Sequence, residues 1–348
     1  MTTPERSAPE MIDWELAVRI GSRIAGDGPA VSRQEAHDAV AELRAGAEAS
    51  TAHVREFTGL EAPEHTAPVL VVDRAGWVRA NCEAFRHVVS PLVAQVGEKR
   101  DPGRLALAVG SRVTGAEVGG LLGFLGTKVL GQFDPFHAPH GRLLLVAPNV
   151  VHVERELDVD PHDFRLWVCL HEETHRVQFT AVPWMREHLF SQVEALAGTL
   201  GDGGLDDLTQ RLGHAIRNRG GSGGSVVELL STPEQQQILD GVTGMMSLLE
   251  GHADVVMDGV GPSVIGSVAQ IRQRFNERRK GVGALDRLLR RVLGLDAKMA
   301  QYRDGARFVN AVVDKVGMAE FNAVWERPEN LPSKAELSDP EAWVTRVL

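Results

Sequence analysis

The stretch His171-Glu172-Glu173-Thr174-His175 reads H-E-x-x-H, and the rest of the sequence is best interpreted from it. Its two histidines are four residues apart, so on a helix they share one face and can reach a single tetrahedral Zn²⁺. Glu172 lies about 100° further round such a helix, beside the metal. There it can accept a proton from a water molecule whose pKa the metal lowers to about 7. The motif predicts His171 and His175 as zinc ligands and Glu172 as general base.

The residues around the motif predict a buried helix. Asp160 and Pro161 supply an N-cap and a proline in the first turn, and Pro183 ends the helix. Apolar residues lie on every side of it: Phe164, Trp167, Val168, Leu170, Val177 and Phe179. Inside a buried helix an unpaired polar group costs about 1–3 kcal/mol, so the histidines need partners. A metal supplies them, and a pair of satisfied core histidines is the alternative.

The third ligand is expected in a second apolar segment, Met245–Met257. Its two carboxylates, Glu250 and Asp254, share one helix face and repel each other unless a positive group lies nearby. A metal meets this need if Glu250 binds it and Asp254 accepts the second ring N–H of a ligand histidine. His252 is the alternative ligand, but it lies about 200° round the helix from Glu250, so the two are not expected to share one metal. The order E-x-x-x-D is similar to the second motif of thermolysin-like gluzincins, which favours Glu250.

Tyr302 is the only tyrosine in the 348 residues. It lies on a predicted helix close to Arg303 and Arg307, and is a candidate donor to the oxyanion that forms when water attacks a carbonyl. The alternative is a packing residue on an amphipathic helix, with its hydroxyl in water.

Composition limits the partners and the location of the protein. The net charge of −10 and the pI near 5.7 argue against nucleic-acid binding and against an anionic membrane surface. The basic stretch from Arg272 to Arg291 is then best interpreted as a solvated helix face. Two cysteines, Cys82 and Cys169, cannot form a disulfide framework, so a reducing cytoplasm is expected.

The periodicity predicts a mainly α-helical protein with a small β element. An N-terminal helical region, 1–66, is expected to pack on one compact domain, 67–348. The glycine-rich stretch Gly115–Phe133 is interrupted by charges, so it predicts a tightly packed core helix rather than a membrane span. A loop is expected at Gln132–Pro135, followed by a strand at Arg142–Val146. If this strand lies at an edge of the sheet, an extended peptide could add to it.

Several segments together resemble the zincin-like metallopeptidase type 2 family. They are Asp73–Val78, Gly131–Pro135, His171–Phe179, Leu249–Asp258, Lys298–Tyr302, Phe321–Trp325 and Asp339–Trp343. The resemblance covers most of the chain beyond residue 70. It implies a zincin-like core, in which the H-E-x-x-H helix faces a second ligand-bearing helix, and a metal-dependent hydrolase, but it supplies no substrate.

The leading hypothesis is therefore a zinc peptidase that uses Glu172 as its base. One alternative is a protein that keeps the zincin fold for binding or as a scaffold, without turnover. Another is a metal-dependent hydrolase of a small amide or ester.

Overall fold

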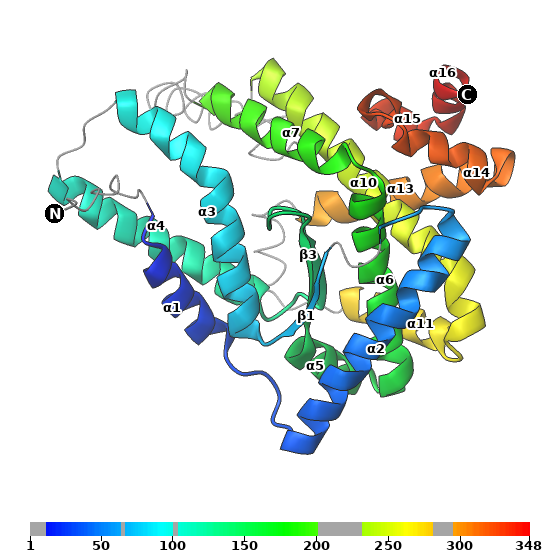
Figure 1. The fold of residues 1–348 in the computed structure, drawn as a ribbon, viewed down its shortest axis with the longest axis horizontal. Coiled ribbons are helices and arrows are strands. Elements are labelled where there is room, and N and C mark those ends of the chain that lie inside the picture. Colours follow the sequence, from blue (N-terminus) through cyan, green and yellow to red (C-terminus); the bar gives the residue numbers. More distant parts are fainter. Residues whose placement is uncertain (1–11, 64–66, 100–103, 201–231, 281–294) are drawn as a thin grey trace. The chain divides into compact units, whose positions relative to one another are not determined.

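The structure is a computed structural model that describes residues 12–63, 67–99, 104–200, 232–280 and 295–348. In these ranges the chain is mainly helical with one three-stranded sheet, which confirms the predicted fold class (Figure 1). The chain forms two compact units. The first combines residues 1–44 with 69–156, and the second combines 45–68 with 157–348. The boundary expected between residues 66 and 67 stays a prediction.

The first unit contains the sheet. Strand β3 (Arg142–Val146) is central, with β1 (Val69–Val72) parallel on one side and β2 (Gly131–Asp134) antiparallel on the other. All five residues of β3 are buried, as expected for a strand paired on both sides. The interpretation of this strand as a free edge for a peptide is therefore wrong. The loop expected at Gln132–Pro135 is also wrong for its first three residues, because they pair with β3.

Glycines allow helix α1 (Trp14–Ala25) to pack against α4 (Arg104–Leu125) in this unit. A Cβ atom on Gly115, Gly119 or Gly123 would lie 2.5–2.7 Å from a backbone carbonyl oxygen in, or just before, α1. This contact agrees with the predicted core helix, although the helix ends at Leu125 and the last residues of the expected stretch lie in β2. None of the described helices combines the length and apolar character that crossing a bilayer requires.

The first unit also contains α3 (Arg74–Lys99), which follows β1 and contacts it, and α5 (Ala147–Leu157), which follows β3. Helix α2 (Arg33–Thr58) contributes residues to both units.

The second unit is built around helix α10 (Pro233–Val264), which packs against α6 (Pro161–Ala181), α7 (Met185–Leu200) and α13 (Leu295–Val316). Helix α6 begins and ends as predicted, since the Asp160 side chain accepts from the backbone N–H of Asp163 and the helix stops before Pro183. Helix α10 starts with a capping box between Thr232 and Gln235, and it contains the whole of the apolar segment Met245–Met257.

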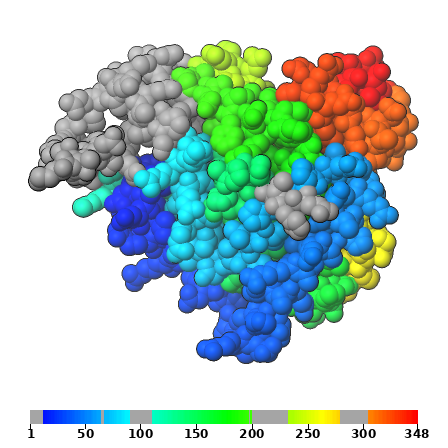
Figure 2. Space-filling view, viewed as in Figure 1, coloured from blue at the N-terminus to red at the C-terminus, as the bar shows by residue number. Residues whose placement is uncertain are grey.

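Short elements close the C-terminal end of this unit. They are α14 (Met318–Phe321), η1 (Asn322–Trp325), η2 (Pro328–Asn330), α15 (Lys334–Ser338) and α16 (Pro340–Val347). They follow α13 in the chain. Helices α14, α15 and α16 pack on α13, and the orange and red atoms of these elements form one continuous group in the space-filling view (Figure 2).

The described part of the basic stretch lies on helix α11 (Val268–Lys280). Arg272 Nη1 is 3.0 Å from the Asp258 carboxylate, and Arg274 Nη1 donates to the Leu157 carbonyl at 3.1 Å. Both side chains remain partly exposed, in keeping with the predicted solvated face. Arg287, Arg290 and Arg291 lie outside the described residues.

Candidate metal centre

The two motif histidines project from the middle of α6. One turn of helix separates them, and their Nε2 atoms face each other at 3.3 Å. Their rings are roughly perpendicular, with centroids 4.8 Å apart. The H-E-x-x-H spacing thus places two imidazole nitrogens at one point, as the sequence predicts for His171 and His175.

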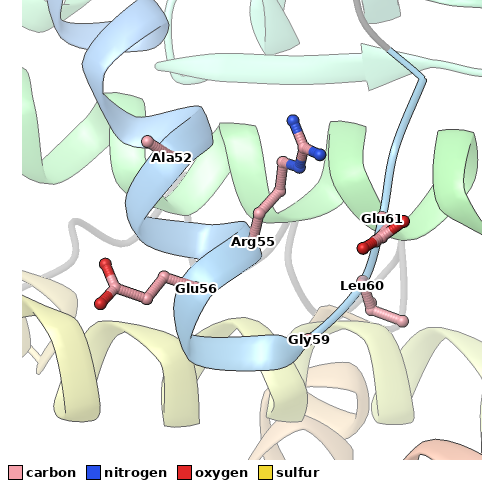
Figure 3. Close-up of a pocket in the computed structure, with 6 residues that line it drawn as sticks. All are labelled: Ala52, Arg55, Glu56, Gly59, Leu60 and Glu61. Atoms are coloured by element: carbon pink, nitrogen blue, oxygen red, sulfur yellow. The ribbon is translucent and has the colours of Figure 1, made fainter.

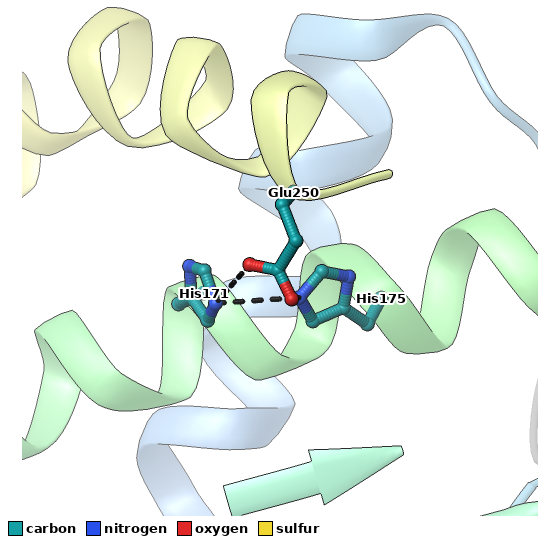
Figure 4. A group of neighbouring side chains, drawn as sticks. All are labelled: His171, His175 and Glu250. Atoms are coloured by element: carbon teal, nitrogen blue, oxygen red, sulfur yellow. Dashed lines mark hydrogen bonds and ion pairs between the residues drawn. The ribbon is translucent and has the colours of Figure 1, made fainter. Parts of the chain in front are cut away.

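Glu250 reaches the same point from α10 (Figure 4). Its Oε2 lies 3.7 Å from His171 Nε2, and its Oε1 lies 3.8 Å from His175 Nε2. One possible ligand atom from each of His171, His175 and Glu250 lies within 4.8 Å of the other two. Among the described residues, no other group of three or more histidine, cysteine, aspartate or glutamate side chains meets this criterion. The side chains of His171, His175 and Glu250 are 26%, 13% and 25% exposed, so solvent reaches all three.

The donor atoms fit a tetrahedral zinc ion in number, type and spacing. Ligand atoms about 2.0–2.1 Å from such an ion lie roughly 3.4 Å from one another. The separations here, 3.3, 3.7 and 3.8 Å, need only small side-chain movements to reach that value. Two histidines and one glutamate form a ligand set that leaves the fourth position of a catalytic zinc for water.

Glu172 lies between the two histidines in sequence and is almost fully buried, with 8% of its surface exposed. Burial raises the pKa of its carboxyl group well above the ordinary value, and the negative charges of Glu250 and Glu173 raise it further. A carboxylate with a raised pKa beside a metal site is a better match to a proton acceptor at neutral pH than an exposed one.

His252 is not part of this cluster. Its side chain is completely buried, and its ring stacks on Phe321 and meets Trp325 edge to face. Burial lowers its pKa to about 3, and the nearby His175 contributes in the same direction. Its Nδ1 atom lies 2.9 Å from the side-chain nitrogen of Gln178. The structure thus brings Glu250, and not the alternative ligand His252, to the two histidines.

Asp254 lies one turn after Glu250 on α10, as expected. Its Oδ1 is 4.0 Å from Arg272 Nη2, and about half of its side chain is exposed. Its predicted support of a ligand histidine stays a prediction. Tyr302 lies on α13, but its side chain is outside the described residues, so its catalytic role also stays a prediction.

Two buried polar residues in or near the motif were not predicted to have a role in the site. The first is Gln178, three residues after His175, which is fully buried and hydrogen-bonded to that histidine. The second is Glu173, whose carboxylate accepts from Arg176 Nε at 2.8 Å and from Thr51 Oγ1 at 3.3 Å. In the sequence, the only signal for either is a polar residue on a helix that is otherwise apolar on every side.

A surface hollow of about 370 Å³ lies elsewhere in the second unit, at the end of α2 (Figure 3). It is lined by Ala52, Arg55, Glu56, Gly59, Leu60 and Glu61. None of the predicted site residues lines it.

Comparison with known proteins agrees with this geometry. A family model described as a zincin-like metallopeptidase matches residues 12–344, nearly the whole chain. The chain belongs to this family. The resemblance found in the sequence is thus confirmed, and its extent is greater than expected, since it includes the N-terminal helices.

The chain is also similar to a solved structure from Chloroflexus aurantiacus, described as "a putative hydrolase with a novel fold". The two chains are 32% identical, and the match covers 96% of this chain and 98% of the other, with a TM-score of 0.69. A comparison with curated proteins found no match.

Proposed function

We propose that this member of the zincin-like metallopeptidase family is a zinc-dependent peptidase. The observation that carries the proposal is the convergence of three ligand atoms, from His171, His175 and Glu250, beside the buried carboxyl group of Glu172. Family membership and the similarity to a chain described as a putative hydrolase support the reaction class. When bound, Zn²⁺ supplies a Lewis acid that polarises a substrate carbonyl and lowers the pKa of a water molecule.

The side chains of the site have two roles, metal binding and proton transfer. His171, His175 and Glu250 hold the cation and leave one side of it accessible, because all three side chains are partly exposed. The Glu172 carboxylate accepts the proton of the attacking water and can return it to the leaving amine. Burial raises the pKa of Glu172 well above the ordinary value, which makes this carboxylate a stronger proton acceptor.

We place this activity in the cytoplasm. Both cysteines, Cys82 and Cys169, are buried and neither is in a disulfide bond, which suits a reducing compartment. Burial raises the pKa of the Cys82 thiol to about 11, with a further contribution from Glu83, so the thiol stays protonated and unreactive at neutral pH.

The test is metal analysis of the purified full chain, followed by digestion of a broad peptide library. We expect one equivalent of zinc and peptide cleavage by the wild type. Glu172→Gln should keep the zinc and lose cleavage, since an amide cannot accept the proton.

Other results would favour other functions. Zinc binding with hydrolysis of small amides or esters, but of no peptide, would support the small-molecule alternative. Zinc binding without any hydrolysis would support a scaffold. A wild-type protein that binds no zinc would overturn the proposal.

A further inference from the structure

Gln178 connects the two helices that carry the predicted ligands. It lies on α6, one turn after His175, and is fully buried. Its Oε1 is 2.9 Å from His175 Nδ1, and its Nε2 is 3.0 Å from the Leu249 carbonyl oxygen and 2.9 Å from His252 Nδ1. Leu249 and His252 are on α10, on either side of the residue pair Glu250-Gly251. One side chain therefore contacts a predicted ligand and the backbone next to another.

The backbone carbonyl of Leu249 fixes the orientation of the Gln178 amide. A carbonyl oxygen only accepts hydrogen bonds, so the NH₂ group of Gln178 must face α10. The amide oxygen then faces His175, and it too only accepts. His175 must therefore carry its proton on Nδ1, which leaves the lone pair of Nε2 free. Nε2 is the atom that faces His171 and Glu250.

The NH₂ group of Gln178 also contacts His252, at Nδ1. Because the second hydrogen of the Gln178 NH₂ group points at His252 Nδ1, that nitrogen must accept, and the ring proton lies on Nε2. The ring is enclosed by Phe321 and Trp325, and among the described residues its Nε2 has no hydrogen-bond partner. A charged imidazolium in this apolar surrounding would be strongly disfavoured, so His252 stays a neutral acceptor.

We propose that Gln178 is a positioning residue of the metal centre. It holds His175 in the tautomer that presents Nε2 to the cation, and it ties α6 to α10 beside Glu250. The positioning role rests on the proposed zinc function. The hydrogen bonds of Gln178 from which it is argued involve only atoms of the protein.

An amide suits this position better than the carboxylate that often supports a ligand histidine. Glu172 already lies close enough to Glu173 and Glu250 to be affected by their charges, and a fourth buried carboxylate would add repulsion. Only an amide also brings two N–H donors, which satisfy the Leu249 carbonyl and His252. Gln178 thus gives the histidine an acceptor and adds no charge.

The first experiment reads the tautomers directly in the metal-free full chain. Long-range ¹H–¹⁵N spectra of ¹⁵N-histidine-labelled protein distinguish a proton on Nδ1 from one on Nε2. Single histidine variants assign the signals. We expect the proton on Nδ1 in His175 and on Nε2 in His252. A wild-type His175 with its proton on Nε2 would overturn the proposal, whether or not the protein binds zinc.

The second experiment separates positioning from general stability. Gln178→Met removes every hydrogen bond at similar volume, and we expect the zinc affinity to fall about 10–100-fold, measured by competition with a chromophoric chelator. Gln178→Glu keeps an acceptor for His175 and loses the paired donors to α10. It should therefore lower Tm and also weaken zinc binding, but by less than Gln178→Met does, because His175 keeps its acceptor. Thr180→Val, which removes a hydroxyl bonded to the Arg176 carbonyl of the same helix, is the matched control and should leave zinc affinity unchanged.

The outcomes are distinguishable. If Gln178→Met binds zinc like the wild type, Gln178 has no positioning role. If both Gln178 variants lose affinity in proportion to their loss of Tm, the residue only stabilises the fold. If the wild type binds no zinc, the proposed function fails, and the tautomer of His175 in the wild type and in Gln178→Met, which lacks the acceptor, still decides whether Gln178 sets it.

Discussion

Gly251 and Gly305 lie in contact where α10 crosses α13. A Cβ atom on Gly251 would lie 2.2 Å from the carbonyl carbon of Gly305, and one on Gly305 would lie 1.9 Å from the backbone oxygen of Ser247. Neither position has room for a side chain, so the two helices pack backbone to backbone. Gly251 follows Glu250 directly, and the crossing therefore also sets the position of the predicted third ligand.

Gly305→Ala should force α13 away from α10. We expect it to destabilise the protein by about 1–3 kcal/mol, the usual cost of overpacking, and to weaken zinc binding because Glu250 moves with α10. Chemical denaturation and chelator competition measure the two effects. Gly241→Ala, also on α10, is the control, because its new Cβ would meet only an ordinary contact at 3.9 Å. Equal stability of the two variants would show that the crossing tolerates a side chain.

Glu250 and Asp254, which both lie on α10, should differ in their effect on zinc. Glu250→Gln removes a charged ligand, so we expect a loss of affinity larger than the roughly 10–100-fold typical of a supporting residue. Asp254→Asn should fall within that smaller range if the side chain supports a ligand histidine as predicted. Chelator competition on both variants gives the order. An unchanged zinc affinity in Asp254→Asn would show that Asp254 does not support a ligand histidine. Its ion pair with Arg272 would then be the interaction that the structure assigns to it.

Tyr302→Phe tests the predicted oxyanion donor. It removes the hydroxyl and little volume, so folding and zinc content should not change. If the hydroxyl stabilises the oxyanion, kcat should fall about 100-fold or more, the usual effect of losing one such donor. Steady-state kinetics on the peptide substrate found by the library screen measure this. Unchanged turnover would assign Tyr302 to packing.

The part of the site that lies within one helix was predictable from the sequence. The spacing of His171 and His175 fixes their geometry once α6 forms, and the capping residues of α6 mark where it starts. Glu250 could be proposed because a carboxylate on an apolar helix needs a positive partner. Gln178 could not, since its partners on α10 are 71 and 74 residues away in sequence and nothing local indicates that contact.

In the sheet, too, contacts between segments far apart in sequence limit what the sequence can predict. Residues 142–146 form a continuous apolar run after Arg142 and were predicted as a strand, whereas Gly131–Asp134 carries glycine, glutamine and aspartate, which are not typical of strands. This segment forms a strand because β3 offers it a partner, and Asp134 also accepts from Arg142 Nε at 3.0 Å. Strand formation that depends on a tertiary partner is invisible to local patterns.

The C-terminal elements should respond to acid through Glu336. Arg346 donates to both of its carboxylate oxygens, at 2.6 and 3.0 Å, and the Ser333 N–H and hydroxyl donate as well. Burial alone would raise the pKa of this carboxyl group, but these hydrogen bonds outweigh burial, and the net pKa lies below the ordinary value of 4.5. The stabilisation is therefore complete above about pH 4.5 and is lost as pH falls through the lower, folded-state pKa.

Glu336→Gln should lower Tm at pH 7, and the difference from the wild type should shrink as the pH falls below 4.5, because the wild-type carboxylate then becomes protonated. Thermal unfolding at pH 7, 5 and 3.5 measures it, with Glu320→Gln at an exposed position as the control. The loss should extend to the surroundings of His252, since Trp343 of α16 packs against Phe321, which stacks on His252. A Tm difference that stays constant across this pH range would mean that the Glu336 charge does not stabilise the C-terminal elements.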